Sequence, residues 1–393
     1  MPAVHPMSLR SSRAAAVVLV TFAAFTDLVA YSIAVPVLPD LSRQLGASPT
    51  VIGLLFASFG VTLLVFSVPM GAVSDRVGRQ VPLVVGLVVL SGASVLFAFA
   101  ERLSWLFAAR LLQGAADAVT WVVGFALIAD LYRPAERGRV MGVVMAGTSF
   151  GLMIGPSLGG WLYETGGMRL PFLAVAGLAA AAAAGFLWLR PPARHAAREA
   201  VPLRLVISVP AVASCTAAVA LAAATLSMLE PVASLWLASS LQLGPTRIGL
   251  VFGIAAVAST ALHPIYGRLA DRWGGRRLTL AGLVAMAAML PVFSRASSFE
   301  SAVALYVVLA AAGAMVITPS LAYMADATSS AGISSFGVAY GLYNFGWGVG
   351  LLAGPAAGGF LYEQLGFSRL TEAWAPAVIL LTVLLMRAGR GTD

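Results

Sequence analysis

The sequence predicts an all-α membrane protein in which twelve transmembrane helices form two pseudo-symmetric six-helix bundles. Three observations lead to this prediction: the composition, a series of apolar runs and an internal repeat. Of the 393 residues, 60% are hydrophobic and only 10% are charged, and the mean hydropathy is +0.92. A water-soluble domain of this size could not carry that composition without large exposed apolar patches. We therefore expect the chain to lie in a lipid bilayer.

Apolar runs of about 20 residues, enough to cross about 30 Å of hydrocarbon as a helix, recur along the whole chain. The first six are separated by short segments with charges or turn residues, such as SDRVGRQ (74–80). The first run ends at Pro36 and Pro39 and not at a small-residue cleavage site, so we expect no separate cleavable signal. These six predicted spans are 14–36, 51–72, 81–100, 104–127, 140–162 and 171–190.

A second set of six runs follows the polar, proline-containing segment RPPARHAAREAVPLR (190–204). Segments such as GRLADRWGGRR (267–277) and LYEQLGFSRLT (361–371) separate these runs. The predicted spans are 208–238, 247–266, 278–297, 300–324, 336–360 and 372–388. The predicted halves are residues 1–190 and 208–393, joined by a cytoplasmic linker at 191–207.

The basic residues set the expected orientation. The sequence contains no lysine, so all 24 basic residues are arginines. With the loops on alternate sides of the membrane, seventeen arginines fall on one side and six on the other, and Arg110 lies within the fourth span. Basic residues are enriched in cytoplasmic loops, so both termini are expected in the cytoplasm. The net charge of +8 then faces anionic lipid, and no nucleic-acid partner is needed to explain it.

An internal repeat indicates how the spans are organised. Two copies of six spans in the same orientation predict two parallel half-bundles that rock against each other. The repeated segments are PTVIGLLF (49–56) and PTRIGLVF (245–252), GAVSDRVGRQ (71–80) and GRLADRWGGR (267–276), and GLMIGPSLGGWLYE (151–164) and GVGLLAGPAAGGFLYE (348–363).

Two matching loops share the pattern Gly-x-x-x-Asp-Arg-x-Gly. For a single loop, an ordinary positive-inside loop is the simpler interpretation, but recurrence at the matching place in the second half favours a gate latch. Asp75 could face a helix N-terminus, while Arg76 and Arg79 could meet helix C-termini or acidic residues. The predicted gating residues are Gly71, Asp75, Arg76, Gly78, Arg79, Gly267, Asp271 and Arg272.

The fifth span carries glycines at a spacing of four, which places all of them on one helix face. A partner helix can approach such a face closely. One interpretation is a packing seam, and the other is a smooth face that slides or bends between two states beside a proline. The residues are Gly147, Gly151, Gly155, Pro156 and Gly159 in the fifth span, and Gly346, Gly350, Gly354 and Gly358 in the eleventh.

Three carboxylates are expected deep in the bilayer: Asp27, Asp117 and Glu230. A charge at the centre of a membrane helix costs about 2.5–3.5 kcal/mol on insertion scales, so each should face the bundle interior, be neutralised or be paired. Asp27 is expected to bind a substrate cation or the coupling proton, with a structural hydrogen bond as the alternative. Glu230 precedes Pro231, which loosens the helix, and the alternative is an interfacial glutamate near the outer end.

Other polar residues of the spans have two interpretations each. Arg110 and Asp117 share one face of the fourth span, so Asp117 is either the partner of Arg110 or a third titrating group. In the eleventh span Tyr340, Asn344 and Trp347 could line a cavity, although helix packing explains Tyr340 and Trp347 equally well. His263 is expected at the interface and not in a proton relay.

Three motifs of the sequence resemble those of the major facilitator superfamily, in its twelve-span drug:proton antiporter branch. GAVSDRVGRQ (71–80) resembles the loop signature of that family, RLLQGAADA (110–118) its fourth-span signature and GTSFGLMIGPSLGG (147–160) its antiporter signature. Within the branch, DLVAYSIAVPVLPD (27–40) and SMLEPVASLW (227–236) resemble the vesicular monoamine and acetylcholine transporters. The resemblance implies that Asp27 and Glu230 act in amine recognition and proton coupling, and that Arg110 and Gln113 organise proton movement.

Three residues depart from the pattern of the vesicular transporters. Phe59 stands where they have a lysine, and Ala314 and Asn344 stand where they have aspartates. Their full ionic network therefore cannot operate in this chain. The lysine-free, alanine-rich sequence with short loops indicates a bacterial relative in the inner membrane.

The sequence thus predicts a transporter and not an enzyme. We expect a monomeric, proton-coupled antiporter that exports organic cations, amphiphilic drugs or amines by alternating access, with export of a neutral metabolite such as a sugar as the alternative. No span offers a nucleophile beside a base, a metal-ligand cluster or a phosphate loop. No cofactor or metal is expected, since the proton gradient supplies the energy.

Overall fold

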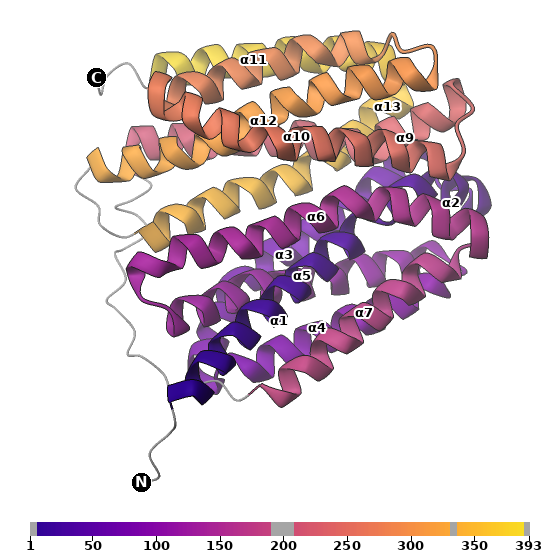
Figure 1. The fold of residues 1–393 in the computed structure, drawn as a ribbon. Helices are drawn as coiled ribbons and strands as arrows, with labels where there is room; N and C mark the ends of the chain where they lie inside the picture. Colours follow the sequence, from indigo (N-terminus) through magenta and orange to yellow (C-terminus); the bar gives the residue numbers. More distant parts are fainter. Residues whose placement is uncertain (1–5, 190–207, 331–335, 389–393) are drawn as a thin grey trace. The chain divides into compact units, whose positions relative to one another are not determined.

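The computed structural model describes residues 6–189, 208–330 and 336–388, and every regular element in these ranges is a helix (Figure 1). The chain divides into two compact units. Unit 1 comprises residues 1–37 and 58–197, and unit 2 comprises residues 38–57 and 198–393. The predicted linker at 191–207 lies outside the described residues, so the predicted boundaries of the two halves stay a prediction.

The described residues of unit 1 form five complete helices, a short 3₁₀ turn and the second part of α3. Within it, α1 packs along α6, and α4 packs between α5 and α7. Prolines and glycines mark several ends, as at Pro134, where a missing N–H costs nothing in the first helical turn. The elements are α1 (Pro6–Ser32), η1 (Val35–Val37), α3 (Pro49–Val77), α4 (Gln80–Ala98), α5 (Leu103–Leu131), α6 (Pro134–Gly166) and α7 (Arg169–Trp188).

Unit 2 repeats this packing. Its α9 packs along α13, and α11 packs against α12 and α13, as α4 packs against α5 and α7 in unit 1. The first part of α3, residues 49–57, also belongs to unit 2. The helices are α2 (Leu38–Leu45), α9 (Pro210–Ser240), α10 (Pro245–Trp273), α11 (Gly275–Phe293), α12 (Phe299–Ser330) and α13 (Phe336–Ala388).

The predicted spans fall on these helices. Eleven helices of the described residues are long and apolar enough to cross a membrane. They account for the twelve predicted spans because α13 contains the last two, which meet at Gly366. Gly366 has a φ of 74°, a conformation that side chains with a Cβ rarely adopt. The two helices are therefore bent apart at this residue while helical hydrogen bonding continues close to it.

The end of α1 differs from the prediction, which ran to residue 36. The helix stops at Ser32 and the chain continues as the 3₁₀ turn Val35–Val37 before α2 begins at Leu38. Pro36 explains this early end, because it lacks the N–H that a continuing helix would need and disfavours helical backbone at the preceding residue.

Many large apolar side chains lie on the outer faces of the helices. Val85 and Val88 of α4 and Leu380 of α13 are each more than half exposed. In water, so many exposed apolar side chains would be unfavourable, whereas hydrocarbon solvates them. This is a multi-pass membrane protein, as the composition predicted.

Candidate functional site

Two carboxyl groups meet in the core of unit 1. Asp27 of α1 is 2% exposed and Asp117 of α5 is 6% exposed. Their carboxyl groups lie close enough to interact, and the indole Nε1 of Trp121 donates a hydrogen bond to Asp117 Oδ1 at 3.0 Å. The Oδ2 atom of Asp27 is buried without a hydrogen-bond partner. The sequence singled out both acids but gave no sign that they touch.

Arg110 lies on the same helix as Asp117 and is fully buried. Its Nη1 donates to the carbonyl oxygen of Tyr31 at 3.4 Å and to Gln113 Oε1 at 3.3 Å. The guanidinium carbon lies 5.7 Å from the ring centroids of both Tyr31 and Phe97. Carbonyl, amide and aromatic contacts are thus among those that hold this cation in an apolar interior, and the structure places Gln113 in direct contact with it.

Phe59, at the position singled out from the resemblance, takes part in aromatic packing. The ring of Phe59 in α3 lies 5.0 Å from the ring of Tyr31. The backbone of α3 comes so close to α5 here that a Cβ atom at Gly114 would overlap the Phe59 carbonyl oxygen. Phe59 therefore packs on Tyr31, which contacts Arg110, and it cannot form an ion pair.

The glycine face of α6 packs on α1, the helix that carries Asp27 (Figure 1). A Cβ atom at Gly151 would lie 2.5 Å from the carbonyl oxygen of Phe25, and one at Gly159 would overlap the carbonyl oxygen of Ile33. Glycine is needed at these positions because the neighbouring backbone leaves no room for a side chain. The predicted close approach of a partner helix is thus present, and the partner is α1.

The glycine face of α13 packs in the same way on α9, the helix that carries Glu230. Gly346 faces Thr216, and Gly354 faces Ala224 and Ser227. The hydroxyl of Ser227 also donates to the Gly350 carbonyl oxygen at 3.1 Å. In each unit, therefore, a glycine-lined helix backs the helix that carries a membrane acid.

The two acid positions are not equivalent in the repeat. Gly147 faces Thr21, and its counterpart Gly346 faces Thr216. In an internal alignment with this register, Asp27 of α1 corresponds to Ala222 of α9. By the same register, Glu230 corresponds to Val35. The fold is pseudo-symmetric, but neither Asp27 nor Glu230 has an acidic counterpart at the equivalent position of the other unit.

Glu230 is half-buried on α9, well before the end of that helix at Ser240. Its carboxylate interacts electrostatically with Tyr306 of α12. The Tyr306 ring packs against Phe252 and Phe293 at centroid distances of 4.9 and 5.1 Å. Glu230 therefore borders an aromatic cluster of unit 2.

The remaining predicted residues of unit 2 differ in their surroundings. Trp347 packs against an apolar cluster that includes Val212 and Tyr323, whereas the side chain of Asn344 is exposed. The side chain of Tyr340 lies outside the described residues. Tyr343, which the sequence did not single out, shares a hydrogen bond of 3.1 Å with Ser320 Oγ.

His263 of α10 contacts α12. Its Nδ1 lies 2.6 Å from the hydroxyl oxygen of Thr318, and the pair is partly buried. Among the described residues, no three histidine, cysteine, aspartate or glutamate side chains are grouped so that they could hold a metal ion.

Arg79 is the centre of an ionic cluster beside the first gating loop. Its Nε donates to Asp130 Oδ2 of α5 at 2.8 Å, and its Nη1 lies 2.6 Å from Asp75 Oδ1. Burial lowers the pKa of Arg79, but the bonds to Asp130 and Asp75 outweigh that effect and raise it, so the guanidinium stays charged. Asp130 was not among the residues predicted from the sequence, although an acidic residue at the end of α5 was a possible partner for a loop arginine.

The second gating loop repeats the acidic residues, but it has no arginine at the position equivalent to Arg79. At the shift of the loop repeat, Asp130 corresponds to Asp326 but Arg79 corresponds to Gly275. A Cβ atom at Gly275 would lie 2.7 Å from the Pro319 carbonyl oxygen, so no long side chain fits there. Gly78 and Gly274 both have positive φ angles, 94° and 89°. The two loops thus share their turn, but the three-residue ionic cluster is built in unit 1.

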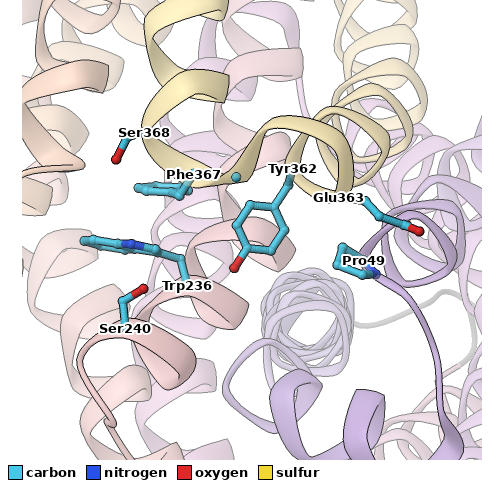
Figure 2. A pocket seen from close by; sticks show the side chains of 8 residues that line it. Pro49, Trp236, Ser240, Tyr362, Glu363, Phe367 and Ser368 are labelled. Carbon is cyan, nitrogen blue, oxygen red and sulfur yellow. The ribbon is translucent and has the colours of Figure 1, made fainter.

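Unit 2 also contains a pocket of about 540 Å³ (Figure 2). Trp236 and Phe367 stack at its side with ring centroids 4.4 Å apart. The Glu363 carboxylate at its rim accepts a hydrogen bond of 2.9 Å from the backbone N–H of Thr50. None of the acids predicted from the sequence lines this pocket, whose lining residues are Pro49, Trp236, Ser240, Tyr362, Glu363, Gly366, Phe367 and Ser368.

The sequence model described as Major Facilitator Superfamily matches residues 20–220 and 215–390. The chain belongs to this superfamily. It is 32% identical to a probable vesicular acetylcholine transporter-B of Danio rerio over 93% of this chain and 78% of that protein. It is 32% identical to the vesicular acetylcholine transporter of Homo sapiens over 85% of this chain and 65% of that protein. A synaptic vesicular amine transporter of Homo sapiens is 27% identical over 84% of this chain and 65% of that protein.

Solved structures agree on the fold. A bacterial homologue of the human lysosomal transporter Spinster superposes with a TM-score of 0.80 at 15% identity, covering 100% of this chain and 98% of that one. The nucleoside transporter NupG superposes with a TM-score of 0.77 at 13% identity, covering 95% and 100%. The superfamily match and the sequence relatives, which include vesicular acetylcholine and amine transporters, indicate a transporter and not an enzyme.

Proposed function

We propose that this major facilitator protein is a proton-coupled antiporter that exports organic cations, amines or amphiphilic drugs. The observation that carries the proposal is the buried carboxyl group of Asp27 on α1, in a chain related to transporters of acetylcholine and amines. A buried acid can hold a proton or attract a cation, but not both at full strength. This mutual exclusion is the physical basis of antiport.

The proposed setting is a bacterial inner membrane, with both termini in the cytoplasm and the protein working as a monomer. Protons that enter from outside would titrate Asp27 and Glu230 and displace the cation outward as the halves alternate. Needing no cofactor, the cycle would draw its energy from the proton gradient. The exposed Asn344, with Tyr340 and Trp347, stays a proposed contact for the substrate.

Transport in proteoliposomes tests this proposal. Permanently charged cations such as acetylcholine and ethidium are suitable probes, because they cannot accumulate by simple protonation as weak bases do. An acidic interior should drive uptake of such a cation into vesicles that contain the protein, and a proton ionophore should abolish it. Uptake that ignores the ionophore would refute proton coupling.

A neutral metabolite such as a sugar remains the second candidate substrate. In that case the carboxyl groups would serve protons alone. Uncharged sugars or nucleosides should then compete with the probe at least as well as other cations do. Under our proposal only cations compete.

Glu230→Gln is expected to weaken proton coupling while cation binding persists. The substitution keeps the shape of the side chain beside Tyr306 but removes its ability to ionise. The measurement is cation uptake at a series of imposed pH gradients, and the expected curve is flatter than that of the wild type. A wild-type response would remove Glu230 from the coupling mechanism.

The ionic cluster around Arg79 is proposed to act as a latch of the first gating loop. Hydrogen bonds to charged groups contribute about 1.5–3 kcal/mol, and 1.4 kcal/mol is about a tenfold change in an equilibrium. Asp130→Asn removes one of these partners and is expected to lower the transport rate about tenfold. Asp326→Asn, at the equivalent position of the second loop, where glycine replaces the arginine, is the matched control and should change it little. Equal effects of both substitutions would contradict a latch role for Arg79.

A further inference from the structure

A second pocket of unit 2, of about 360 Å³, lies where α10 ends and α11 begins. Its volume falls within the range of small-molecule sites. Two arginines and a tryptophan form its polar side, and none of its lining residues that the structure describes is acidic. We call this site the arginine pocket, and its lining residues are Arg272, Trp273, Arg277, Leu278, Ala281 and Met315.

The two arginines of this pocket have no partner within residues 6–189, 208–330 and 336–388. Neither Arg272 nor Arg277 forms a hydrogen bond or an ion pair there. Arg276, which lies between them, instead donates from Nη2 to the carbonyl oxygen of Met386 at 3.0 Å. The segment 267–277 contains four arginines and one aspartate, a net charge of +3. Both guanidinium groups are therefore available to bind an anion.

The position of Arg277 also favours an anion. Arg277 lies in the first turn of α11, where the partial positive charge of the helix end disfavours a second cation. No acidic residue in this turn offsets the repulsion. An anion held beside Arg277 would do so.

The place of the pocket along the helices indicates where that anion comes from. The pocket lies at the junction of two candidate membrane spans, Pro245–Trp273 and Gly275–Phe293. The ends of membrane spans lie at the level of the lipid head groups. Trp273 is more than half exposed there, and tryptophan is enriched at this boundary of membrane proteins. The phosphate groups of the bilayer are therefore the nearest anions.

The apolar wall of the pocket continues into the region of the acyl chains. Ala281 and Val284 follow Arg277 on one exposed face of α11, because residues three and four apart in a helix are neighbours. Met315 of α12 borders this face. A Cβ atom at Gly282 would lie 2.9 Å from the carbonyl carbon of Met315, so α11 and α12 are in close contact here. A soluble phosphate compound would use the arginines but not this apolar face, whereas a lipid would use both.

Unit 1 does not repeat this site. At the shift of the loop repeat, valines replace both the tryptophan and the second arginine, and these valines are more than half exposed. The equivalent residues are Arg76, Val77 and Val81.

We propose that the arginine pocket binds the phosphate of an anionic phospholipid, with an acyl chain along Ala281 and Val284. Arg272 and Arg277 hold the phosphate, because the planar guanidinium group matches phosphate oxygens with paired hydrogen bonds. Basic pockets between membrane helices bind anionic head groups in this way. The inference is independent of the proposed function, since it involves no transported substrate.

Native mass spectrometry of the full-length protein in detergent tests the arginines. Phosphatidylglycerol is the probe, and phosphatidylcholine with the same acyl chains is its zwitterionic control. The wild type should bind phosphatidylglycerol more tightly. Arg272→Gln and Arg277→Gln should each weaken this binding about fivefold, and the double variant about 25-fold, as expected for basic residues beside anionic lipid. Equal binding of the two lipids by the wild type would overturn the proposal.

Arg268→Gln is the matched control for charge. Arg268 is exposed on α10 and belongs to the same basic segment, but it does not line the pocket. Its substitution should change phosphatidylglycerol affinity less than twofold. A loss as large as that in Arg272→Gln would show diffuse attraction to the whole segment and would contradict a defined site. Thermal unfolding and sizing without added lipid check that each variant is folded.

A second pair of measurements separates a lipid from a soluble phosphate. Glycerophosphoglycerol, the same head group without acyl chains, should fail to displace phosphatidylglycerol even in large excess. Ala281→Phe should weaken phosphatidylglycerol binding, because the ring fills the apolar wall of the pocket. Val85→Phe, at the equivalent exposed position of unit 1, is the control and should leave binding unchanged. Efficient displacement by the soluble head group, or equal effects of the two phenylalanines, would overturn the assignment of a lipid.

Discussion

Asp27→Asn is expected to abolish proton-driven transport of organic cations while the protein still folds. Asparagine has nearly the same volume and can donate a hydrogen bond to Asp117, so the packing of α1 on α5 should survive. Removing one partner of a buried charge pair costs about 2–5 kcal/mol, and each 1.4 kcal/mol is about tenfold in affinity. Transport at low cation concentration should therefore fall by at least about 30-fold.

The measurement is uptake of a permanently charged cation into proteoliposomes with an acidic interior. Thermal unfolding in detergent and elution on a sizing column provide the control for folding. Wild-type transport in this variant would remove Asp27 from the mechanism and leave the structural hydrogen bond as its role.

Gly151→Val is expected to disrupt the seam between α6 and α1. The new side chain would have to occupy space in which even a Cβ atom lies 2.5 Å from the Phe25 carbonyl oxygen. That neighbour is backbone and cannot rotate away, so the helices must separate. Overpacking of this kind costs about 1–3 kcal/mol, and because α1 also carries Asp27, transport should be lost along with stability.

Gly142→Val is the matched control on the same helix. A Cβ atom at Gly142 meets no other atom within 4 Å, so valine there should leave both thermal unfolding and cation uptake close to wild type. Equal behaviour of the two variants would show that the glycine face is not a tight seam. The comparison separates the effect of close packing from the general effect of valine in a helix.

Hydropathy and repeats along the chain predicted the fold correctly. Each span is long enough to be recognised by itself, because a helix satisfies its own backbone hydrogen bonds and needs only apolar side chains to lie in lipid. The loop, fourth-span and antiporter motifs indicated the superfamily, and the match over residues 20–220 and 215–390 confirms it. The meeting of the last two spans at Gly366 was not visible, because helix continuity there depends on the local backbone angle.

The sequence by itself determined that Asp27 lies in a membrane span and that Gly151 and its neighbours share one helix face, since both follow from composition and from the helical period. Only the tertiary structure decided that Asp27 meets Asp117, that Arg79 reaches Asp130, and that α1 is the helix on which the glycines of α6 pack. Helical spacing determines which way a side chain points from its own axis, whereas its partner depends on which helix packs alongside and in what register, and those are properties of the folded bundle.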